Sequence, residues 1–464
     1  MRLLIAVIFL IGAPMTLPEM AIPAAASESA EKAAAFYDPS PAHIWNRLYA
    51  ALLVREDSHG GQYDADSLDP PLWLESEYLL AGPSHARALR VLDEFLQTHA
   101  ENLIRDPLKR AMLQRDLWAV FDWSVQQESA RQRPHYDNER RELQTRLAEA
   151  LRRLALSPKE IESLPDNYAQ AVASGAFAKD YDPAHRERAF LPPDLFDGSW
   201  LYIDSSPEEF NSGGVAPSHV EAFSGRSRFL VFMRLPEGRK ATLAYLQALW
   251  NFPQPWVQGR PDSAADQAVI NPDLPSFPAG TELALVRQMT LFDGQGNLVP
   301  TPITESVQIR VYYAITPTLQ ACCPGDMSDI ARISGQDFYQ FTLSRAQLFA
   351  SKADGLRSTG RDEKQLSTFQ QQGGDLIDEF SENPALKKTW LPALQTCLAC
   401  HIKGGVRSLN SLGKLLKPNW RQRDFGDEPY PPRWWLNAGT TDWKRDRYDW
   451  GLLNGYWRSD NRFY

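Results

Sequence analysis

The stretch "TELALVRQMTLFDGQGNLVPTPITESVQIRVYYAI", residues 281–315, decides the fold class. It holds two runs rich in β-branched and aromatic residues, and the turn residues DGQGN separate them. In the second run Val307 and Ile309 alternate with the polar Gln308 and Arg310, which is the period of a half-buried strand. The stretch therefore predicts two strands joined by a turn.

The residues on either side of this stretch predict further strands and one helix that belong to the same domain. "GSWLYIDSS" and "RSRFLVFMRL" are short runs of the β type, whereas "RKATLAYLQALWNF" has the pattern of a short amphipathic helix. "PDSAADQAVINPDLPSFPAG" is predicted to be a loop. We therefore expect residues 196–350 to form an α+β domain with an antiparallel sheet.

The segment before it, residues 27–195, is predicted to be a helical domain. The Asp-Pro pair at 106–107 is a signal that opens a helix. Ser157, with Pro158 in the first turn and Glu160 three residues on, is a capping signal for another. A longer helix is predicted from leucines that share one face at spacings of four, four and three: Leu143, Leu147, Leu151 and Leu154.

The overall size predicts several domains. The chain has 464 residues, which is too long for one compact core. After the central domain, residues 351–464 are predicted to be mostly helical and to end in a tail rich in tryptophan. The net charge is −9, and without a basic block this argues against a nucleic-acid partner. The fold class expected is α+β and multidomain.

The first residues have the features of a secretory signal. Arg2 is followed by an apolar run over residues 3–12, and small residues at 24–26 suit cleavage. The run is shorter than the ~20 apolar residues that span a bilayer. We expect residues 1–26 to be a cleaved signal peptide and the mature chain to be periplasmic, without a stable membrane span.

The pentapeptide Cys-Leu-Ala-Cys-His at residues 397–401 carries the clearest chemistry in the chain. This C-x-x-C-H pattern matches the attachment signature of c-type haem. Two thiols one helical turn apart can form thioethers with the two vinyl groups of one porphyrin. The histidine that follows directly can then present its imidazole to the iron from the same side.

On this motif the segment resembles the c-type cytochromes; the resemblance covers the motif and the helical region expected around it. It implies one covalent haem c per chain, held by Cys397 and Cys400, with His401 as the proximal iron ligand. It also implies a cytochrome c-like C-terminal region. Attachment of this kind takes place outside the cytoplasm, in agreement with the predicted signal peptide.

The second axial ligand does not follow from the motif, because no methionine or histidine comes after His401. It is therefore brought from upstream, supplied by an unusual group, or absent. The candidates are Met327, in the loop "CCPGDMSD", and His219, the best-placed loop histidine. A methionine raises the reduction potential, a second histidine lowers it, and an open position binds peroxide or a small gas.

Other roles for the cysteines remain open. Cys397 and Cys400 form a possible dithiol pair, although no buried strand is predicted before them. Together with the adjacent Cys322 and Cys323 they also offer four thiolates, the set of a structural zinc site. Plain disulfides are a further alternative.

Three functions are consistent with these features. The first is an exported mono-haem c-type cytochrome that transfers electrons to a redox partner protein. The alternative is a haem enzyme or sensor with an open iron site for peroxide or small-gas chemistry. The second alternative is a non-haem binding protein stabilised by zinc or disulfides. No nucleophile elbow or zinc-protease helix is present in the sequence to suggest a hydrolase.

Overall fold

The computed structural model describes thirteen segments of the chain, and every structural statement below concerns them. They are residues 35–56, 62–66, 78–126, 136–203, 216–258, 268–315, 335–350, 355–360, 363–366, 390–392, 401, 403–409 and 439–459.

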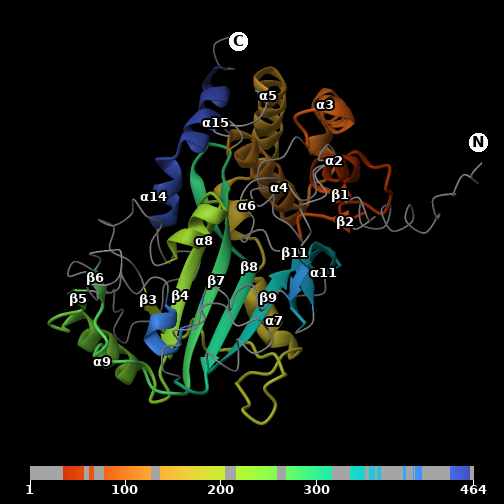
Figure 1. Cartoon of the computed structure of the whole chain (residues 1–464). Coiled ribbons are helices and arrows are strands. Elements are labelled where there is room, and N and C mark those ends of the chain that lie inside the picture. Colours follow the sequence, from red (N-terminus) through yellow and green to blue (C-terminus); the bar gives the residue numbers. More distant parts are fainter. Residues whose placement is uncertain are drawn as a thin grey trace, which may run out of the picture.

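A six-stranded antiparallel sheet forms the centre of the protein (Figure 1). Its strand order is β10-β9-β8-β7-β4-β3, and each neighbouring pair is antiparallel. The strands are β3 (Leu201–Ile203), β4 (Ser227–Arg234), β7 (Thr281–Phe292), β8 (Leu298–Tyr312), β9 (Gln336–Leu343) and β10 (Leu356–Ser358). With the helices described below, the sheet confirms the predicted α+β class.

The hairpin predicted from residues 281–315 is confirmed as β7 and β8. The side chain of Asp293 closes its turn, since its carboxylate accepts hydrogen bonds from the backbone N–H groups of Gln295 and Asn297 at 2.9 and 2.8 Å. Gly296 has φ +80°, a left-handed conformation that glycine adopts without strain. The turn residues thus set the register of the two longest strands.

The two faces of the sheet differ as the alternation along β8 predicts. On one face Val307, Ile309 and Val311 are buried in a cluster that also takes in residues of β4, β7 and β9. Gln308 and Arg310 point to the other face and are partly exposed. The second face, named here the Arg310 face, carries side chains that the strand register places in neighbouring positions: Phe229, Arg287, Gln308, Arg310, Tyr312 and Gln336.

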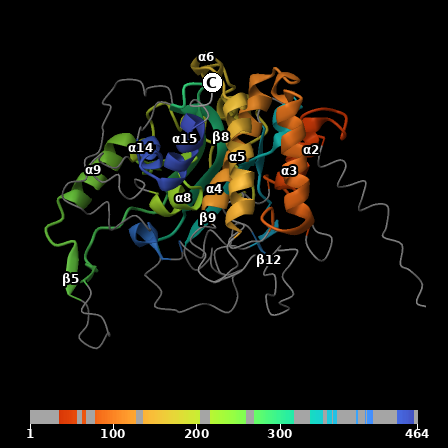
Figure 2. The ribbon, with the colours of Figure 1, turned by 90° about the horizontal axis from the view of Figure 1, so that it is seen from above.

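The N-terminal residues form a helical layer against one end of the sheet (Figure 2). Its helices are α2 (Ile44–Leu53), α3 (Gly82–Gln97), α4 (Pro107–Gln126), α5 (Asp137–Leu154) and α6 (Pro158–Glu162). Helix α7 (Asn167–Ser174) lies apart from them and packs on β8 and β10. The predicted leucine stripe is confirmed in α5, where all four leucines are fully buried. The predicted capping box of Ser157 and Glu160 is confirmed at α6.

Helix α4 packs between α5 and the sheet and is buried on all sides along its middle. Its polar residues therefore find partners inside the protein. Arg115 pairs with Glu305 of β8 at 2.6 Å, and Asp122 pairs with Lys444 at 2.6 Å. Asp116 also contacts Arg345, so α4 is linked to three other segments by buried charges.

The region after residue 351 differs in part from the helical pattern predicted for it. Helices α14 (Gly439–Arg445) and α15 (Tyr448–Ser459) are present. The described residues also form β10, β11 (Lys364–Leu366), β12 (Trp390–Pro392) and the 3₁₀ helix η6 (Gly405–Ser408). The prediction of a helix was wrong at β10, because pairing with β9 decides the conformation there.

Side chains from the three predicted domains meet in shared hydrophobic clusters. Trp450 of α15 contacts Trp118 of α4 and Phe292 of β7, with ring centroids 5.8 and 6.0 Å apart. Trp457 also lies against Phe292, at 4.8 Å. Trp450 is a core residue and Trp457 is a partly buried residue packed against the core, and the domain limits at 195 and 350 stay predictions.

Short elements complete the described chain. They are α8 (Pro217–Ala222), α9 (Arg239–Trp250), α11 (Arg345–Phe349), η2 (Ala100–Asn102), and the two-residue or three-residue strands β1 (Arg55–Glu56), β2 (Gln62–Tyr63), β5 (Trp256–Gln258) and β6 (Ala268–Ile270). The predicted helix α9 is confirmed, whereas β6 is a strand inside a predicted loop. Within the described segments, no helix has the length and apolar character needed to cross a membrane.

Candidate functional site

The predicted site residues divide into two groups. Cys397 and Cys400, which the motif assigns to haem attachment, lie outside the described residues, as does Met327. The adjacent pair of cysteines at 322–323 also lies outside them. His401 and His219 are described, and the structure places both over the Arg310 face of the sheet.

The imidazole of His401 is held through its Nδ1 atom. This nitrogen lies 2.8 Å from the backbone carbonyl oxygen of Ser408. A carbonyl oxygen only accepts, so Nδ1 carries the proton and Nε2 keeps a lone pair. Burial, with the nearby charge of Arg310, lowers the pKa of His401 to about 3, so the ring is neutral at ordinary pH. A neutral imidazole with a fixed tautomer is the form that binds a metal through Nε2.

The backbone around His401 is fastened to strands β8 and β9. The side-chain amide of Gln336 donates to the carbonyl oxygen of His401 at 2.7 Å. The hydroxyl groups of Tyr312 and Ser408 lie 2.5 Å apart, and Arg310 reaches the carbonyl oxygen of Ser408 at 3.4 Å. Three side chains of the sheet thereby position the segment that carries the histidine.

His219 lies in the short helix α8 and not in a loop, so its predicted setting was wrong. The reason is Pro217, whose fixed φ favours the first turn of a helix. The ring of His219 stacks at 35° on Phe229 of β4, with centroids 5.4 Å apart. Burial, together with Arg310 and Arg287, lowers the pKa of His219 to about 4, so this imidazole is neutral as well.

The two histidines belong to one cluster. A positive charge on His219 would lower the pKa of His401, and Arg310 acts on the pKa of both rings. Both rings lie over the Arg310 face, His219 on Phe229 of β4 and His401 in the segment that Gln336 of β9 holds. The structure therefore places the predicted proximal ligand and one of its two predicted partners over the same face of the sheet.

A second arginine borders the cluster. Arg287 of β7 is the register partner of Phe229, on which His219 stacks. Its guanidinium lies 4.1 Å from the ring centre of Phe223, and its Nε atom is 3.5 Å from a carboxylate oxygen of Glu305. The surroundings of the histidines are thus basic on the side of β7 and β8.

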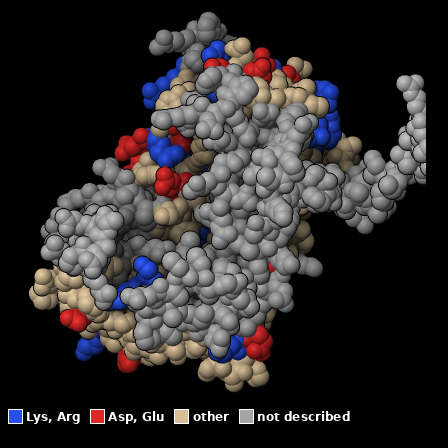
Figure 3. Space-filling view, viewed as in Figure 1, with Lys and Arg blue, Asp and Glu red and all other residues tan. Residues whose placement is uncertain are grey.

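Sequence analysis did not single out Arg310, Arg287 or Ser408 as site residues. The signal for Arg310 was present, because it occupies a polar position in the alternating pattern of β8. Ser408 gave no signal in the sequence, because it binds His401 through its backbone carbonyl, a group that every residue has. On the face that Figure 3 draws, the described basic and acidic residues are interspersed without a broad basic patch.

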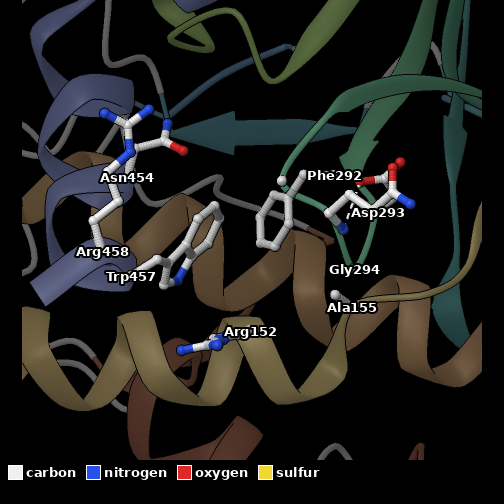
Figure 4. A pocket seen from close by; sticks show the side chains of 10 residues that line it. Arg152, Ala155, Phe292, Asp293, Gly294, Asn454, Trp457 and Arg458 are labelled. Carbon is white, nitrogen blue, oxygen red and sulfur yellow. Dashed lines mark hydrogen bonds between the residues drawn. The ribbon is translucent and has the colours of Figure 1, made fainter. Parts of the chain in front are cut away.

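A recess of about 270 Å³ lies at the opposite end of the β7–β8 hairpin (Figure 4). Its wall includes the turn at residues 293–296 and the side chains of Arg152, Asn454, Trp457 and Arg458. Neither His401 nor His219 lines it, so the recess is separate from the histidine cluster.

The absence of a predicted buried strand before the motif counts against a dithiol redox site, and the described residues there form one short strand, Trp390–Pro392. This strand, β12, pairs with β11 in a two-stranded ribbon and is not part of the central sheet. A search of the described residues gives no group of three or more histidine, cysteine or acidic side chains that would hold a metal ion. The four cysteines lie outside that search.

No protein-family model, curated protein or solved structure matches this chain.

Proposed function

We propose that this chain is an exported mono-haem c-type cytochrome that transfers electrons. One haem c is attached to Cys397 and Cys400, and Nε2 of His401 is the proximal ligand of its iron. The observation that carries the proposal is the hydrogen bond from His401 Nδ1 to the carbonyl oxygen of Ser408, beside a C-x-x-C-H motif.

The described residues suit this group chemically. A histidine that binds a metal usually donates its other ring N–H to a carbonyl or carboxylate, and this contact fixes the orientation of the ring. His401 has that arrangement, and its low pKa keeps Nε2 free of a proton. When bound, the haem supplies a one-electron redox couple. The protein orients the ring through Ser408 and holds its backbone through Gln336.

The setting we propose is the periplasm, reached through the signal peptide of residues 1–26. An exported one-electron carrier needs a second redox protein to donate or accept the electron. Export also supplies the compartment in which haem is attached to such motifs, so the two sequence signals support one another.

Attachment is tested on the full chain, exported from a host with haem-attachment machinery. The peptide that spans residues 397–401 should gain the mass of one haem, and the ferrous pyridine complex should have the spectrum of a haem bound through two thioethers. Cys397→Ser with Cys400→Ser should abolish both signals.

The matched control is Cys322→Ser with Cys323→Ser, which removes the other two thiols of the chain. It should leave the haem in place and show that the loss is specific to the motif. Unmodified 397–401 peptide in the exported wild-type protein, accompanied by stoichiometric zinc, would instead establish the non-haem alternative.

A further inference from the structure

We propose that His219 is the second axial ligand, so that the haem lies between α8 and η6 with a histidine on each side of its iron. This inference rests on the proposed function, because it needs a haem on His401. It assigns a role to a residue of the central domain, 182 positions before the proximal histidine in the sequence.

The first argument is position. His401 is fastened to β8 and β9 through Tyr312 and Gln336, and His219 is stacked on Phe229 of β4. The register of the sheet places Phe229 and Tyr312 on the same face. The two rings therefore stand over one face of the sheet and are carried by two different elements, α8 and the segment that leads into η6.

The second argument is rigidity. A ligand must be held in place before the metal arrives if its coordination is to be specific. Helix α8 packs on β4, and Val220, next to His219, is fully buried in a small cluster with Phe229 and Phe223. The chain then turns at Gly225, whose left-handed φ of +70° lets it pack against Trp443. Helix α8 is thus held against β4, and Trp443 of α14 packs on the turn that follows it.

The third argument is the placement of the other described candidates. Met112, Met233 and Met289 are fully buried in hydrophobic clusters. Met233 shares the Arg310 face, but it packs among the leucines of α9. The remaining described histidines make contacts elsewhere: His43 caps α2, His85 bonds to Leu79, His99 pairs with Glu101, and His185 pairs with Glu187.

The surroundings also suit the rest of the cofactor. A haem carries two propionates, and carboxylates form their strongest contacts with guanidinium groups. Arg310 and Arg287 border the cluster on strands β8 and β7. The two imidazoles that would bind the iron are neutral, and the two arginines at the edge of the site are positively charged, as propionates require.

Two axial histidines give a six-coordinate, low-spin iron with a low reduction potential. Such an iron has no open position for peroxide or a gas. The inference therefore favours electron transfer over the alternative of a haem enzyme or sensor.

The test uses the full-length haem protein and electron paramagnetic resonance of its ferric form. Wild type should be low-spin, and His219→Ala should be high-spin and bind cyanide readily. Added imidazole should restore the low-spin signal, because it fills the space left by the side chain. His185→Ala, which removes a histidine on an exposed loop, should leave the spectrum unchanged.

A second variant covers the case in which His219→Ala fails to fold. His219→Met should keep a low-spin iron, gain a sulfur-to-iron absorption band and raise the reduction potential. A high-spin wild type, or a low-spin spectrum that neither His219 variant changes, would overturn the inference. Mass analysis separates this from failure of the proposed function, since the haem would still be attached in those outcomes.

Discussion

At the scale of single residues, the candidate site depends on how Ser408 is held. Its carbonyl oxygen accepts from His401 and its hydroxyl contacts that of Tyr312, which is fully buried. Ser408 also donates to the carbonyl oxygen of Gly405 at 2.8 Å, which closes η6. Tyr312 of β8 thereby influences the orientation of the His401 imidazole indirectly. It contacts the hydroxyl of Ser408, and the carbonyl oxygen of Ser408 binds the imidazole.

We expect Tyr312→Phe to lower the free energy of unfolding by about 1 kcal/mol, the usual net contribution of one buried hydrogen bond. In the haem protein the variant should also broaden the spectrum of the iron, because His401 is held less firmly. Urea unfolding and electron paramagnetic resonance measure the two effects. Tyr448→Phe, at a residue that is 66% exposed, should change stability by less than about 0.5 kcal/mol. Equal effects of the two changes would contradict this account of η6.

A residue of the site could be predicted from the sequence only where it belongs to a recognisable motif or to a periodic strand pattern. His401 follows from the motif, and Arg310 lies on the polar side of an alternating strand. His219 was selected as a loop histidine, and its helical setting and neighbours depend on tertiary packing. Arg287 and Gln336 come to the site through strand pairing, which links positions far apart in the sequence.

At the scale of elements, α5 shows how a periodic pattern becomes a stable helix. Its leucines recur every three or four residues and all face the core shared with α3 and α4. The opposite side carries charged residues, including Arg153, which pairs with Glu149 four positions before it at 2.6 Å. Burial of the leucine stripe stabilises the helix far more than these surface pairs do.

We expect Leu147→Ala to lower the free energy of unfolding by about 2–5 kcal/mol, because it leaves a cavity in a fully packed core. Leu103→Ala makes the same chemical change at a residue that is 59% exposed, and it should cost less than about 0.5 kcal/mol. Chemical denaturation of the two variants measures the contrast. A loss of under about 1 kcal/mol at Leu147 would mean that the core can collapse around the gap.

Most of the long elements were predictable, whereas a short one was predictable only where a local signal marks it, as the capping box marks α6. The strands β4, β7 and β8 and the helices α4, α5 and α9 each extend over eight or more residues, so their composition, periodicity or first-turn signals are visible in the sequence. The strands β10 and β12 have three residues each, too few for a period to show. Their conformation comes from pairing with β9 and β11, so it is a property of the assembled fold.

At the scale of the whole molecule, buried ion pairs join the C-terminal helix α14 to helix α4 and to the residue before strand β4. Lys444 of α14 is fully buried and contacts both Asp122 and Asp449, at 2.6 and 3.0 Å. Arg226, at the start of β4, lies 3.3 Å from Asp122, and Arg447 pairs with Asp449. Removing one member of such a group leaves an uncompensated charge, so the network makes the docking of α14 specific.

This network predicts a pH dependence of stability. Burial raises the pKa of Asp122 to about 7, against the opposing effect of Lys444, whereas an unfolded aspartate titrates near pH ~4. The folded state thus binds this proton more tightly. The resulting stabilisation is complete below about pH 4 and is lost as the pH rises through 7.

Asp122→Asn removes this titration while keeping the volume of the side chain. The free energy of unfolding of wild type relative to Asp122→Asn should therefore increase as the pH falls from 7 to 4. Denaturation curves at several pH values measure the difference, with Asp442→Asn on the exposed side of α14 as the control. A difference that is independent of pH, or that shrinks on acidification, would show that Asp122 is ionised throughout this range.

The fastening of His401 by Tyr312 and Gln336 also bears on the order of assembly. All six strands of the sheet precede His401 in the chain, so they are synthesised before it. The contacts of His401 with Gln336 and of Ser408 with Tyr312 therefore form on strands that are already made. Folding of the sheet does not have to wait for this last part of the site.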